Sequence, residues 1–157
     1  MRTNVFIPLI ASVLSSPSYG QAAKGFDYVP YFSAVVVSNV DSSAKWYQAV
    51  FAMTVKNKME DTNHDYRIFI LESSQFVLEL LELKGSLTRK NLLEGKPAGT
   101  QIQGHFKIGF KVAEMDDCLK RLASLKINVP QVWTDTATKK RNFLITDPDG
   151  NLIQFFE

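Results

Sequence analysis

One order of predicted elements occurs twice between about Tyr31 and Glu157, and this repeat limits the possible folds more than any other feature of the chain. In each half, a β-branched strand leads into a helix with one apolar face, and three further strands follow. A repeat of element order and spacing indicates two tandem βαβββ modules within one α+β domain over residues 31–157.

The first module is predicted over residues 31–83. Its opening strand is the run YFSAVVVSNV, and the side-chain oxygens of Asp41, Ser42 and Ser43 predict the start of a helix over about 43–52. Three strands are then expected near residues 54–59, 64–71 and 75–83. The stretch 84–104 combines glycines with charged residues and is predicted to be a linker.

The second module is predicted over residues 105–157. It is expected to contain a strand at 105–112, a helix at 113–126, and strands at 128–134, 139–146 and 151–156. The last two strands are separated by the run DPDG, in which proline suits the second position of a tight turn and glycine suits the fourth.

Residues 1–23 differ in composition from the rest of the chain. Arg2 is the only charge before Lys24, the run VFIPLIASVL is apolar, and small polar residues follow it. This order is typical of a secretory signal peptide with cleavage near residues 20–23, so we expect an exported protein, periplasmic or secreted. The apolar run is shorter than the roughly 20 residues of a membrane-spanning helix, so no membrane span is expected.

Charge and cysteine content narrow the function classes further. The formal net charge is only +2 and the charges are dispersed, which argues against nucleic-acid binding. Cys118 is the only cysteine, so no disulfide can form within the chain. It lies at helical spacing from Met115 and Leu122 and is predicted to be a core thiol.

Four segments make the chain similar to the vicinal oxygen chelate superfamily, which includes glyoxalase I, the bleomycin resistance proteins and the extradiol dioxygenases. These segments are VVVSNVDSSAKWYQAVFAM, FVLELLE, FKIGFKVAEMDDCLKRLASLKI and FLITDPDGNLIQFFE. The resemblance implies that the two modules form a curved, cup-like sheet with pseudo-twofold symmetry. It also implies that the functional site lies in the cup, where the family's enzymes hold a divalent metal.

The family's four metal-ligand positions fall on Phe32, Glu79, Lys107 and Gln154 of this chain. Only Glu79 is a usual ligand at its place, because phenylalanine has no donor atom and a protonated lysine repels a cation. We therefore expect no cofactor, and a divalent metal is disfavoured. If a metal binds in a shifted register, its expected ligands are Glu79, His105 and Gln154.

An ion pair between Glu79 and Lys107 is predicted in place of the metal, because a buried carboxylate needs a compensating charge. The pair either satisfies a site that has lost its metal or orients a polar group of a ligand between apolar walls. Two arginines at matching places in the modules are further candidates. The predicted ligand-binding residues are Phe32, Glu79, Lys107, Gln154, Phe156, Arg67 and Arg141.

Three functions compete at this point. The first is an exported, non-enzymatic protein that binds a small organic molecule in the cup without a metal, as antibiotic-binding members of the family do. The second is a metal-dependent lyase, isomerase or dioxygenase with altered ligands. The third is an interaction module with an empty cup. The sequence leaves open whether two copies pair as a homodimer.

Overall fold

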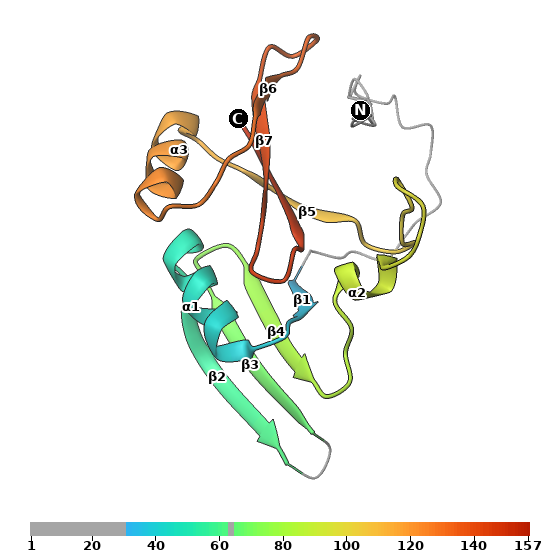
Figure 1. Ribbon diagram of the computed structural model, residues 1–157. Coiled ribbons are helices and arrows are strands. Elements are labelled where there is room, and N and C mark those ends of the chain that lie inside the picture. The colour runs from blue at the N-terminus through green and yellow to red at the C-terminus, as the bar shows by residue number, and fades with distance from the viewer. Residues whose placement is uncertain (1–30, 63–64) are drawn as a thin grey trace, which may run out of the picture. The chain divides into compact units, whose positions relative to one another are not determined.

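The computed structural model describes residues 31–62 and 65–157. Within it, residues 31–157 form one compact unit (Figure 1). The predicted signal peptide, residues 1–23, lies outside the described residues. In the part of the chain that is described, no helix has the length and apolar character needed to cross a membrane.

The first module contains a four-stranded sheet, here called the N-terminal sheet, and one long helix. Its elements are β1 (Phe32–Val36), α1 (Val40–Phe51), β2 (Thr54–Asp61), β3 (Tyr66–Glu72) and β4 (Val77–Leu83). The strand order is β1-β4-β3-β2, with β1 parallel to β4 and the other neighbours antiparallel. The parallel pair requires a crossover connection, and the crossover begins with α1.

The second module repeats this arrangement in what we call the C-terminal sheet. Its elements are β5 (Lys107–Lys111), α3 (Met115–Ser124), β6 (Val132–Thr134), β7 (Arg141–Thr146) and β8 (Leu152–Phe156). The strand order is β5-β8-β7-β6. The predicted α+β class with tandem βαβββ modules is confirmed. The linker also contains a short helix that was not predicted, α2 (Arg89–Leu93).

Helix α1 begins earlier than its sequence predicted. Its N-cap is Asn39, whose Oδ1 accepts a hydrogen bond from the backbone N–H of Ser42 at 2.9 Å. The backbone N–H of Val40 donates to Glu82 Oε2 at 2.8 Å. Asp41 lies in the first turn of the helix. Its carboxylate accepts a hydrogen bond from Arg67 and does not cap the helix. The predicted cap at residues 41–43 was therefore wrong, because Asn39 supplies one capping oxygen and Glu82, on the neighbouring strand β4, supplies the second.

One apolar core joins the inner faces of the two sheets. Its buried strand residues are Phe69, Leu71, Leu78 and Leu80 from the N-terminal sheet and Phe143, Ile145, Ile153 and Phe155 from the C-terminal sheet. Cys118 of α3 is half-buried against this core, and burial raises the pKa of its thiol.

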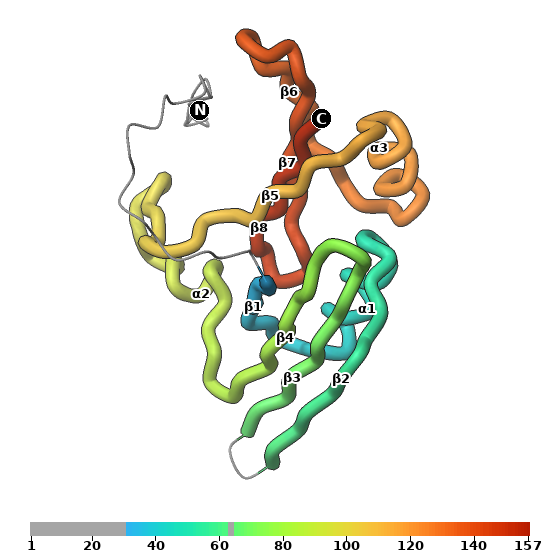
Figure 2. The backbone as a smooth tube through the Cα atoms, turned by 180° about the vertical axis from the view of Figure 1, so that it is seen from behind, coloured from blue at the N-terminus to red at the C-terminus, as the bar shows by residue number. Residues whose placement is uncertain are grey.

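The end of α1 packs between the modules. The ring of Phe51 lies 4.9 Å from that of Phe110 and 5.7 Å from that of Phe155, measured between centroids. Arg121 of α3 donates through Nε to the carbonyl oxygen of Val50 at 3.0 Å. Both views of the backbone show the end of α1 next to α3 (Figure 2). The modules therefore meet through their helices, and no strand of one sheet is hydrogen-bonded to a strand of the other in the described chain.

Candidate functional site

The turn between β7 and β8 forms hydrogen bonds with residues of the first module. Asp147 is buried and accepts a hydrogen bond from the Tyr47 hydroxyl at 2.9 Å. Burial, followed by the charge of Asp147, raises the pKa of Tyr47 well above its usual range. Asp149 accepts from the backbone N–H of Ser38 at 3.1 Å and from Ser43 Oγ at 3.3 Å. The DPDG run is therefore both a turn and a contact between modules.

The outer face of the N-terminal sheet, opposite the core, is apolar around the carboxylate of Glu79. The parallel register pairs Ala34 with Glu79 and Val36 with Leu81, so these side chains share a face with Phe32. Phe32 is 53% exposed and Val36 is 46% exposed. Glu79 is half-buried on the inner strand β4 and has no side-chain partner within the described residues.

The outer face of the C-terminal sheet is basic at its edge and aromatic at its end. Lys107, Gly109 and Lys111 alternate along β5, and their register partners on β8 include Gln154 and Phe156. Gln154 is 2% exposed, and its Nε2 donates to Asn142 Oδ1 at 2.9 Å. The register therefore places Lys107, Gln154 and Phe156 on one face, as strand alternation predicted.

The predicted ion pair between Glu79 and Lys107 is absent from the described chain. Glu79 lies on an inner strand of the N-terminal sheet, whereas Lys107 lies on the edge strand of the C-terminal sheet. The prediction assumed that one chain brings the two outer faces together. The modules instead meet through their helices and inner faces, so the two groups are not brought into contact.

Arg67 and Arg141 lie on the inner faces, at matching places in the two modules. Arg67 Nη2 is 2.7 Å from Asp41 Oδ2 on α1, and Arg141 Nη1 is 2.6 Å from Asp116 Oδ1 on α3. This differs from the expectation that both arginines line the site with Glu79. Each arginine instead ties a helix to a strand, and the hydrogen bond to Asp41 raises the pKa of Arg67.

Arg141 also binds the last residue of the chain. Its Nη2 lies 2.8 Å from Glu157 Oε1, and its backbone N–H donates to Glu157 Oε2 at 3.1 Å. The side-chain and backbone hydrogen bonds from Arg141 lower the pKa of Glu157 to about 2.

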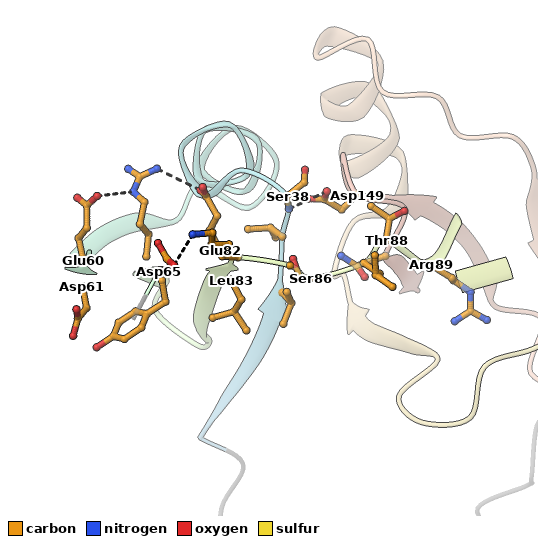
Figure 3. Close-up of a pocket in the computed structure, with 18 of the residues that line it drawn as sticks. Ser38, Glu60, Asp61, Asp65, Glu82, Leu83, Ser86, Thr88, Arg89 and Asp149 are labelled. Carbon is orange, nitrogen blue, oxygen red and sulfur yellow. Dashed lines mark hydrogen bonds and ion pairs between the residues drawn. The ribbon is translucent and has the colours of Figure 1, made fainter. Parts of the chain in front are cut away.

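A groove of about 580 Å³ lies where β1 and β4 end, beside the start of the linker and the β7–β8 turn (Figure 3). Most of its charged side chains already have partners: Arg67 contacts Glu60 and Glu82, and Lys84 contacts Asp65. None of Phe32, Glu79, Lys107, Gln154 and Phe156 lines it. Sequence reasoning missed this groove because its walls come from four separated segments that meet only in the folded chain.

The residues at the four family positions offer few donors to a divalent metal. Phe32 offers no donor, Lys107 offers an ammonium group, and the Gln154 amide is bound to Asn142. One carboxylate, Glu79, is too few donors for a metal that takes several oxygen or imidazole ligands. His105 is exposed and precedes β5. Within the described residues, no three His, Cys, Asp or Glu side chains are grouped to hold a metal ion.

The family and the solved structures that this chain resembles share its fold. The family model described as Glyoxalase/Bleomycin resistance protein/Dioxygenase superfamily matches residues 28–155. A glyoxalase family protein from Enterococcus faecalis superposes with a TM-score of 0.71 and 19% identity, covering 82% of this chain and 97% of that one. No curated protein sequence matches the chain.

Two further solved structures carry activities in their names. The trypanothione-dependent glyoxalase I of Leishmania major has a TM-score of 0.60 and 17% identity, covering 83% of this chain and 87% of that one. The fosfomycin resistance protein FosX of Listeria monocytogenes, complexed with Mn(II) and sulfate, has a TM-score of 0.59 and 12% identity, covering 84% and 93%. At such identities the likeness shows a common fold alone.

Proposed function

Because the chain belongs to the Glyoxalase/Bleomycin resistance protein/Dioxygenase superfamily, we propose that it binds a small organic molecule on the outer faces of its two sheets, without a divalent metal. In this proposal the protein is a binder and not an enzyme. The outer faces take the place of the family's cup, and the side chains at the metal positions contact the ligand directly.

One observation carries this proposal: an exposed apolar surface coincides with a donor set that does not suit a metal. Phe32 and Val36 remain exposed on the N-terminal sheet, next to the carboxylate of Glu79. Small-molecule sites are mostly apolar with a few polar groups that fix orientation, and this face has that composition. Contiguous exposed apolar surface is also uncommon on proteins that bind nothing there.

Thermal-shift screening against small aromatic compounds and antibiotics tests the binding. A ligand that binds only the folded protein raises the melting temperature. We expect Phe32→Ala and Glu79→Gln to remove most of that rise, whereas Leu87→Ala, at a 64% exposed linker position, leaves it intact. A rise that survives both outer-face variants would contradict the proposed place of binding, and no rise with any compound would contradict the function.

Elemental analysis of the purified protein tests the metal-free part of the proposal. We expect zinc, nickel, manganese and iron to be far below one ion per chain. Stoichiometric metal that is lost in Glu79→Ala and in His105→Ala would instead support the metal-dependent lyase, isomerase or dioxygenase. Metal retained by both variants would place the ion elsewhere on the chain.

A second copy of the chain is the proposed partner that closes the cup. The outer face of the N-terminal sheet carries the carboxylate of Glu79, and that of the C-terminal sheet carries Lys107 and Lys111. These charges are complementary, so a twofold dimer would set each N-terminal sheet against the C-terminal sheet of the other copy. Such a dimer would also cover the exposed side chains of Phe32 and Val36.

Export is also part of the proposal, and the composition of residues 1–23 supports it. N-terminal sequencing of the protein from periplasmic extract or culture medium is expected to give a start between residues 21 and 24. Recovery of the chain from the cytosol with Met1 intact would contradict export without affecting the proposed binding.

A further inference from the structure

The outer face of the C-terminal sheet contains a buried amide oxygen that has no partner. The Oε1 atom of Gln154 is buried, and no donor among the described residues reaches it. The same amide is fixed by its other end, because Nε2 donates to Asn142 Oδ1. Buried acceptors nearly always have a donor, since their desolvation is otherwise uncompensated. The oxygen is therefore suited to a donor that a ligand supplies.

Two cationic side chains flank this amide on the edge strand β5. Gly109 is the register partner of Gln154, and Lys107 and Lys111 lie two residues to either side of it on the same face. Both lysines are exposed, and neither has an ion-pair partner within the described chain. Long side chains from these two positions can converge on one anionic group on this face, beside the ring of Phe156.

Aromatic side chains share this face with the amide. A Cβ atom added at Gly109 would come within 3.2 Å of Phe156 Cε2, so the ring of Phe156 lies over this glycine. Trp133 of β6 lies on the same face, as the register partner of Asn142. Flat apolar rings beside a polar group favour a planar ligand.

We propose that this face binds an aromatic carboxylate that carries an N–H donor. The carboxylate contacts Lys107 and Lys111, the aromatic ring lies against Phe156, and the N–H donates to Gln154 Oε1. This inference rests on the proposed function and names its ligand class. The strand registers place Lys107 and Lys111 on this face and no carboxylate, so the local field favours an anion over a cation.

Four matched probes test this ligand class by calorimetric titration of the full chain. Indole-3-carboxylate has both the charge and the donor, and 1-methylindole-3-carboxylate lacks the donor. Indole-3-carboxamide is neutral, and indole-3-methanamine is a cation. We expect indole-3-carboxylate to bind best, with about a tenfold loss of affinity when either the charge or the donor is removed.

Variants assign each contact to its side chain. Lys107→Gln and Lys111→Gln are each expected to weaken both carboxylates by about tenfold, whereas Lys90→Gln, on the linker helix α2, leaves them unchanged. Gln154→Met is expected to equalise the affinities of the methylated and unmethylated carboxylates. Because Gln154 is buried, its variant is first checked for folding by circular dichroism, and Lys107→Gln and Lys111→Gln test the charge independently.

Several results would overturn the inference. These are tightest binding by the cation, carboxylate binding that survives both lysine changes, or failure of both carboxylates to bind the parent chain. In each case the proposed function would stand if other compounds still raise the melting temperature in a manner that depends on Phe32. If no compound raised the melting temperature, both the ligand class and the proposed function would be contradicted.

Discussion

The hydroxyl of Tyr47 makes a buried contact between the two modules. It donates to Asp147, which also accepts from the backbone N–H groups of Asp149 and Asn151. Three of these four residues belong to the β7–β8 turn, so the single hydroxyl from α1 joins a preformed acceptor. At the scale of one residue, the stability of the domain depends on whether such buried groups are paired.

Tyr47→Phe is expected to lower the free energy of unfolding by about 1.5–3 kcal/mol, the range for hydrogen bonds to charged groups. Urea unfolding measures this change. Tyr66→Phe is the matched control, because the Tyr66 hydroxyl has no hydrogen-bond partner within the described chain. If Tyr47→Phe and Tyr66→Phe lowered the free energy of unfolding equally, the hydrogen bond to Asp147 would make no contribution of its own to stability.

Glu157 is expected to make stability depend on acidity. Its pKa falls from 4.5 to about 2 in the folded chain, because Arg141 hydrogen-bonds its carboxylate. A lowered folded pKa means that the contribution is complete above pH 4.5 and is lost as the pH falls towards 2. The difference in unfolding free energy between the parent chain and Glu157→Gln should therefore shrink across that window.

Urea unfolding at a series of pH values measures this difference. Glu94→Gln is the control, because Glu94 is exposed and its side chain has no partner among the described residues. Its difference from the parent chain is expected to stay constant with pH. A constant difference for Glu157→Gln would contradict the assigned hydrogen bonds.

At the scale of elements, the β7–β8 turn fixes the start of α1. Asp149 accepts from the backbone N–H of Ser38 and from the hydroxyl of Ser43, which is fully buried. Asn39 and Glu82 cap the same end of the helix from within the first module. Helix α1 therefore depends on both modules for its position, although its apolar periodicity alone predicts that it forms.

Asp149→Ala is expected to loosen this junction, because it leaves the buried Ser43 hydroxyl without its acceptor. The expected loss is about 1–3 kcal/mol in the free energy of unfolding, with faster hydrogen exchange at the Ser38 amide. Asp117→Ala removes an exposed carboxylate that contacts Lys120 on α3, and it should change the free energy of unfolding little, because exposed ion pairs are weak. Unchanged exchange at Ser38 in Asp149→Ala would contradict the contact.

At the scale of the whole molecule, the outer face of the N-terminal sheet is the surface that a second copy would cover. We expect the protein to be a dimer by light scattering coupled to size-exclusion chromatography. Phe32→Asp should give a folded monomer, because a carboxylate buried at this interface would be costly to desolvate. Leu87→Asp is the control at an exposed position outside this face. A parent chain that is monomeric at all concentrations would contradict the dimer.

The two arginines show how much of their structural role could be predicted from the sequence. Both arginines were predicted to bind ligand beside Glu79, but Arg67 has the same strand parity as Phe69 and Leu71, and Arg141 has the same parity as Phe143 and Ile145. Strand alternation would therefore have been enough to place both on the inner face. Their carboxylate partners on the helices could not be predicted. Those contacts depend on where each helix crosses its sheet, which is a property of packing and not of local pattern.

The order of the elements, the two βαβββ modules and the faces of Glu79, Lys107 and Gln154 followed from the sequence by itself. Periodicities of 2 and 3.6 residues and turn preferences are local, so they can be read along the chain. Only the tertiary structure decided that the modules meet through their helices and that a groove forms beside the β7–β8 turn. It also decided that Glu79 and Lys107 do not pair with each other within the described residues. These features join residues far apart in the chain, and their energies depend on burial and on partners that no local pattern specifies.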